Sequence, residues 1–134
     1  MNRKISIFSL LLLFTCSFCF SFSETNGQLR NREQGWTREW NSLCEMCSNL
    51  SGESYINLRN YMMGFSDAAY QLYEYLYSLY NDNYYYKQYI FYYEQSQNAI
   101  KKYGARTSGF RIYYYNAGAD RIDKAGRRFS FYDF

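Results

Sequence analysis

Histidine, proline and valine are absent from this chain of 134 residues. Because histidine is the commonest general base among side chains and a frequent metal ligand, its absence argues against an enzyme. Carboxylate or tyrosine chemistry remains compatible with the composition. We therefore expect a protein that is not an enzyme and that holds no cofactor and no metal.

The first residues have the three parts of an export signal. Two positive charges precede an apolar run over residues 5–22, and the small residues Ser21 and Ser23 stand at its end. This pattern predicts a signal peptide over residues 1–23, and hence a secreted, periplasmic or cell-surface protein. Two alternatives stay open. The apolar run is about 18 residues long, the lower limit for an uncleaved membrane anchor, and Cys16 lies in a weak lipidation box.

Cleavage of the signal would leave one small domain, because about 100 residues suffice for a single modest core. We divide this part of the chain into a polar, loose arm over residues 24–35 and a tyrosine-rich helical domain over residues 36–128. An aromatic tail over residues 129–134 follows.

Charge is polarised along the chain. Residues 24–100 carry nine acidic and five basic side chains, whereas residues 101–134 carry eight basic and three acidic ones. Such asymmetry can mark contact with an anionic partner. The candidate residues for an anionic glycan or a membrane surface are Arg121, Lys124, Arg127 and Arg128. Export argues against nucleic acid as a partner. The alternative is that these side chains are solvated or paired with nearby carboxylates.

Helical periodicity begins at Trp36. Spacings of four and three residues place one set of side chains on a single stripe of a helix: Trp36, Trp40, Leu43, Cys47 and Leu50. Ser51 and Gly52 then predict the end of this helix, because glycine readily takes the left-handed conformation that a helix terminus needs.

Cys44 and Cys47 are the cysteines that signal cleavage would leave. Exported proteins meet oxidising conditions, so this pair is our candidate disulfide. An i, i+3 pair in a regular helix can bond only with some distortion, however. Buried thiols, redox chemistry, metal binding and intermolecular pairing are the alternatives. Two thiolates supply only half of the four ligands that a structural zinc site needs.

Residues 58–79 give the clearest helix. Its apolar residues form a heptad-like seam: Leu58, Met62, Phe65, Ala69, Leu72, Leu76 and Leu79. Tyrosines lie beside the seam, and the remaining polar strip is narrow: Gly64, Asp67, Gln71, Glu74 and Ser78. We expect Asp67 and Glu74 to be solvated. Since the apolar arc is wider than that of an ordinary surface helix, this helix should be central or should also pack on a partner.

A polar connection over residues 81–83 predicts an antiparallel helical hairpin, with Asp82 or Asn83 capping the helix that follows. The inner face expected for that helix consists of Tyr86, Ile90, Tyr93, Gln97 and Ile100. Gly104 marks its expected end.

The segment 110–129 predicts a fourth helix, capped by Thr107 or Ser108. Ala117, Gly118 and Ala125 would allow close approach to a neighbouring helix. A strand over residues 110–115 is the alternative, because isoleucine and tyrosine favour strands.

These patterns together predict an all-α bundle of three or four helices behind a signal or anchor segment. We expect a small exported structural or interaction protein that packs against itself or an envelope assembly, since tyrosine is enriched at interfaces. The candidate interface residues are Tyr70, Tyr73, Tyr77, Tyr80 and Tyr84. A module that binds an anionic glycan or the envelope surface through the basic segment is one alternative. A membrane-anchored accessory subunit is the other.

Overall fold

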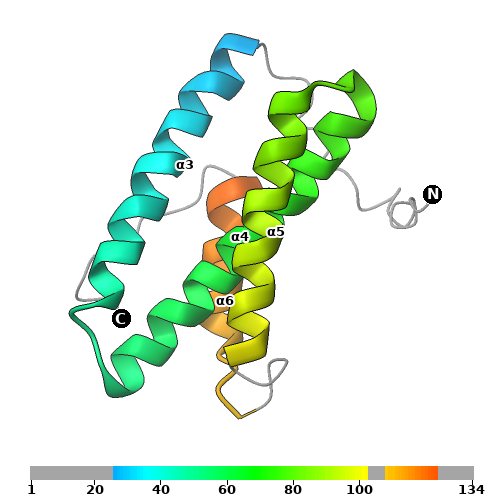
Figure 1. Ribbon diagram of the computed structural model, residues 1–134. Helices are drawn as coiled ribbons and strands as arrows, with labels where there is room; N and C mark the ends of the chain where they lie inside the picture. The colour runs from blue at the N-terminus through cyan, green and yellow to red at the C-terminus, as the bar shows by residue number, and fades with distance from the viewer. Residues whose placement is uncertain (1–25, 103–107, 124–134) are drawn as a thin grey trace. The chain divides into compact units, whose positions relative to one another are not determined.

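The computed structural model describes residues 26–102 and 108–123, and every regular element in these two ranges is a helix. The helices are α3 (Asn26–Cys47), α4 (Gly52–Tyr80), α5 (Asn83–Lys102) and α6 (Ile112–Asp123). The predicted all-α class is therefore confirmed (Figure 1). The expected signal or anchor segment and the aromatic tail lie outside the described residues.

The first helix begins earlier than the apolar pattern indicates. We expected a loose arm over residues 24–35, but α3 already starts at Asn26. The chain divides after Gly35 into two compact units, and the packing described below belongs to the second. In that unit the predicted stripe is confirmed for Trp36, Trp40 and Leu43, which are all buried. It is wrong for Leu50, because α3 ends at Cys47.

Helix α4 is the centre of the bundle. It packs against α5 and against α6 (Figure 1), and every residue but one from Asn57 to Ala69 is buried, whichever side of the helix it occupies. The predicted seam is confirmed from Leu58 to Leu76. The prediction is wrong for its last member, because the Leu79 side chain is 49% exposed.

The backbones of α4 and α6 touch where two glycines meet the opposite helix. A Cβ atom added at Gly64 would lie within 3.0 Å of the Tyr115 carbonyl, and one added at Gly118 would lie equally close to the Tyr61 carbonyl. We expected Gly64 to lie on a solvated strip, because the other residues of that strip are polar. The structure instead places Gly64 against the backbone of α6. The close approach predicted for Gly118 is consistent with this contact.

The hairpin between α4 and α5 is built as its turn residues predict. Asn81 adopts the left-handed conformation, with φ of 50°, and its N–H donates to the Tyr77 carbonyl at 2.8 Å. The Asp82 carboxylate then accepts a hydrogen bond from the Tyr84 N–H at 2.9 Å. The backbone of Asn81 therefore ends α4, and the side chain of Asp82 caps α5.

The buried side of α5 differs from our expectation. The structure buries Tyr92, Ser96 and Ala99, whereas Tyr86 and Tyr93, which we assigned to the inner face, are 42% and 38% exposed. The physical reason is size and polarity. Ser96 and Ala99 are small enough for α5 to approach α4, and Ser96 hydrogen bonds to a buried carboxylate of α4.

Helix α6 is held at its start by a side chain from α4. Asn60, which is fully buried, donates to the Gly109 carbonyl at 2.8 Å and accepts the Arg111 N–H at 2.9 Å. We expected a local cap from Thr107 or Ser108. Thr107 lies outside the described residues, and the cap that the structure shows comes from Asn60 instead. The strand alternative is wrong for residues 112–115, which are helical.

Replacing Asn60 by alanine should therefore lower the free energy of unfolding by about 2 kcal/mol, because a cap is lost and two buried backbone groups lose their partner. Urea denaturation followed by circular dichroism measures this. Asn98→Ala is the control, since Asn98 is exposed on α5 and should change stability by less than about 0.5 kcal/mol. Equal effects of the two substitutions would contradict the assigned role.

Candidate interaction surface

Five aromatic side chains form a buried inner cluster, in which α3, α4 and α5 meet: Trp36, Trp40, Phe65, Tyr73 and Tyr92. The Tyr73 and Tyr92 rings stack in parallel with centroids 6.1 Å apart, and Trp36 packs edge-on against Tyr73 at 6.3 Å. Tyr73 is only 2% exposed. It is therefore a core residue, and its assignment to the interface was wrong.

A second set of rings forms what we call the tyrosine row, which bridges α4 and α5: Tyr70, Tyr77, Tyr86, Tyr89 and Tyr93. Tyr70 contacts Tyr93 and Tyr89 at centroid distances of 5.3 and 6.1 Å. Tyr86 continues the row to Tyr77 at 5.3 Å. These residues are half-buried or exposed, so each ring packs on its neighbours while part of it faces solvent.

Two phenols of the tyrosine row, Tyr70 and Tyr89, have raised pKa values. Burial first, and then the nearby carboxylates of Asp67 and Glu74, raise the pKa of Tyr70 to about 12. The pKa of Tyr89 is raised for the same reasons, burial first and then Glu74. These two phenols therefore stay protonated near neutral pH and remain hydrogen-bond donors as well as apolar surface.

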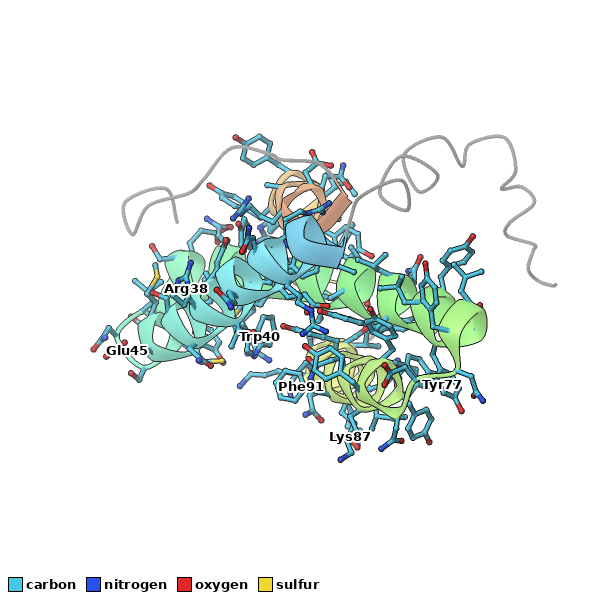
Figure 2. The ribbon with its side chains drawn as sticks, turned by 90° about the horizontal axis from the view of Figure 1, so that it is seen from above. Arg38, Trp40, Glu45, Tyr77, Lys87 and Phe91 are labelled. Carbon is cyan, nitrogen blue, oxygen red and sulfur yellow. The ribbon has the colours of Figure 1, made fainter. Side chains whose placement is uncertain are left out.

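The end of the hairpin adds exposed apolar side chains to this surface. Leu79, Tyr80 and Tyr84 are 49%, 60% and 47% exposed. We use "hairpin tip" for these three residues. Figure 2 shows Tyr77 near this end of α4 and Lys87 pointing outward from α5. We use "tyrosine-rich surface" for the row and the tip together.

Four of the five candidate interface residues belong to this surface. Tyr70 and Tyr77 are in the row, and Tyr80 and Tyr84 are at the tip. The sequence reasoning missed Tyr86 and Tyr93, because it placed them on the inner face of α5. A signal for the true arrangement was available, since the small residues Ser96 and Ala99 are the natural place for a close helix contact.

Arg121 of the candidate anion-binding set is already paired. Its guanidinium lies 2.6 Å from a carboxylate oxygen of Glu39, and that carboxylate also accepts the Tyr61 hydroxyl at 2.6 Å. Burial, followed by the Glu39 hydrogen bond, raises the pKa of Tyr61. Arg121 therefore neutralises a half-buried carboxylate, and its role as an anion ligand stays a prediction. The other three candidates, Lys124, Arg127 and Arg128, lie outside the described residues.

A second carboxylate is buried where α4, α5 and α6 meet. Asp67 is 4% exposed and accepts hydrogen bonds from the hydroxyls of Ser96 and Tyr115. Our expectation that Asp67 is solvated was therefore wrong, whereas Glu74, two turns further along α4, is exposed as expected. Asp67 joins three helices through two hydroxyl donors.

The cysteine pair lies in the last turn of α3. Both thiols are free in the structure, Cys44 exposed and Cys47 half-buried. Burial raises the pKa of the Cys44 thiol, the neighbouring Cys47 raises it further, and Arg59 opposes both effects. The Cys47 thiol donates to the sulfur of Met62 at 3.5 Å. The disulfide stays a prediction, and the helix that carries the pair is regular up to Cys47.

Comparison with known proteins gives no relative: no family model, no curated protein and no solved structure matches this chain. Within residues 26–102 and 108–123, no helix combines the length and the apolar character needed to cross a bilayer. In the same ranges no three cysteine or carboxylate side chains gather in a group that could hold a metal ion.

Proposed function

We propose that this is a small exported interaction protein, not an enzyme, that associates with further copies of itself through its tyrosine-rich surface. The observation that carries the proposal is the large number of partly exposed tyrosine rings on α4, α5 and their connection. Tyrosine and exposed leucine in one patch are typical of interfaces, because such side chains release water on contact while the phenol hydroxyls keep a hydrogen-bonding partner.

A second copy is the partner that the charges beside this surface fit best. Lys87 and Glu94 are both exposed on α5, two turns apart, with Phe91 between them and 41% exposed. In a two-fold symmetric contact between antiparallel α5 helices, Lys87 of one copy would lie opposite Glu94 of the other. A self-complementary stripe of this kind supports self-association over binding to a strongly charged partner.

Substituting both Tyr80 and Tyr84 by glutamate should dissociate the assembly, because two carboxylates would have to be buried without partners. We expect light scattering of residues 24–134 to give a mass that rises with concentration for the native sequence and stays at that of a monomer for the double variant. Both residues are exposed, so the fold of the single chain should be unchanged, as circular dichroism would show.

Tyr113→Glu is the matched control. Tyr113 is 55% exposed but lies on α6, away from the tyrosine-rich surface, so its substitution should leave the assembly intact. If the native chain remains a monomer at every concentration, the proposal of self-association is contradicted. Mass spectrometry of the native protein tests export separately, because a mature N-terminus at Glu24 requires signal cleavage.

A further inference from the structure

Three sulfur-bearing side chains come together where the end of α3 meets α4. Cys44 and Cys47 are one turn apart on α3, so their side chains lie on the same side of the helix. Met62 of α4 adds its thioether, 3.5 Å from the Cys47 sulfur. The Cys44 thiol, which is open to solvent, therefore lies one helical turn from a half-buried contact between the Cys47 thiol and the Met62 thioether.

Arg59 provides a second, independent observation at the same place. Its terminal nitrogen Nη1 lies 3.9 Å from the Cys47 sulfur. Its Nε is buried and has no hydrogen-bond partner among the residues that the structure describes. Burying an unpaired N–H of a cation lowers the stability of the folded chain. A negative charge near this position would therefore stabilise Arg59.

We propose that Cys44, Cys47 and Met62 form a binding site for a soft monovalent metal ion, Cu(I). Thiolate and thioether sulfurs are the ligands that Cu(I) prefers, whereas structural zinc requires four ligands and rarely takes a thioether. We initially expected no metal, because two cysteines are fewer than the four ligands that structural zinc needs. The third ligand is on a different helix, and the tertiary structure supplies it.

The charges at this site balance when the ion binds. Both thiols lose their protons to solvent, each sulfur forms a bond to the metal, and the thioether of Met62 binds without a change of charge. One Cu(I) and two thiolates leave a single negative charge. The Arg59 guanidinium, whose Nη1 lies 3.9 Å from the Cys47 sulfur, compensates that charge. No electron is transferred in this step.

The experiment is a competition between the reduced chain of residues 24–134, which lacks Cys16 and Cys19, and a chromophoric Cu(I) chelator under anaerobic conditions. We expect one equivalent of Cu(I) to move from the chelator to the native chain. Cys44→Ser and Cys47→Ser should each weaken binding by about a hundredfold or more, and Met62→Leu by at least about tenfold. X-ray absorption of the copper-loaded chain should then report a coordination shell of sulfur alone.

Met63→Leu is the matched control, because Met63 is the adjacent methionine of α4 and is fully buried. Leucine has nearly the volume of methionine, so both methionine variants should fold, which circular dichroism checks. Met63→Leu should leave the affinity for Cu(I) unchanged. A native chain that takes no copper, or a Met62→Leu chain that binds as tightly as the native one, would overturn the three-sulfur site. Neither result bears on self-association, which uses the other end of the hairpin.

Discussion

Replacing Gly64 by alanine should destabilise the protein by about 3 kcal/mol or more, the upper range for overpacking in a closed core. The added methyl group would meet the carbonyl of Tyr115 and lie 3.1 Å from the Ala119 nitrogen. Both are backbone atoms of α6, so no side chain can turn away, and the two helices would have to separate. Gly118→Ala should have a similar effect, because its Cβ would meet the Tyr61 carbonyl and lie 2.9 Å from the Phe65 nitrogen.

Gly35→Ala is the control for helix propensity. Gly35 is also helical, but a Cβ there has nothing within 4 Å. Alanine at that position should stabilise its helix by up to about 1 kcal/mol. Urea denaturation of the three variants therefore separates close packing from backbone entropy. If Gly64→Ala and Gly35→Ala both stabilise the chain, the contact between α4 and α6 is not as close as described.

Replacing Asp67 by alanine should cost about 3 kcal/mol of stability, because the hydroxyls of Ser96 and Tyr115 lose their acceptor inside the bundle. The loss affects α5 and α6 together, since both are joined to α4 by this carboxylate. The measurement is again the free energy of unfolding. A loss of this size is a large part of the total stability of a small domain, which is about 5–15 kcal/mol.

A double-mutant cycle assigns the loss to the named contacts. Ser96→Ala and Tyr115→Phe each remove one hydroxyl, and each should have a much smaller effect once Asp67 is already alanine. Glu74→Ala is the control, because Glu74 is an exposed carboxylate of the same helix and should change stability by less than about 0.5 kcal/mol. Additive effects of Asp67 and Ser96 substitutions would show that the two side chains do not interact.

The elements that could be predicted from the sequence are those that rest on local chemistry. The spacing of Leu58 to Leu76 is helical whatever surrounds it, and Asp82 caps α5 through its own neighbouring backbone. The faces of α5 could not be predicted in this way. A tyrosine suits both a buried and an exposed position, because its ring is apolar and its hydroxyl is polar. In a helix with tyrosine on several sides, periodicity alone therefore does not identify the inner one.

The sequence by itself determined that this chain is helical and that residues 81–83 reverse its direction. It also determined that the apolar and aromatic arc of residues 58–79 is wider than the buried face of an ordinary surface helix. Only the tertiary structure decided which tyrosines are core and which form a surface. It also decided that Asp67 is buried, that Gly64 is a backbone contact, and that Met62 stands beside Cys47. The physical reason is common to all of these. Each depends on a contact with a residue of another helix. The spacing of residues within one helix does not show which distant residue will lie against it.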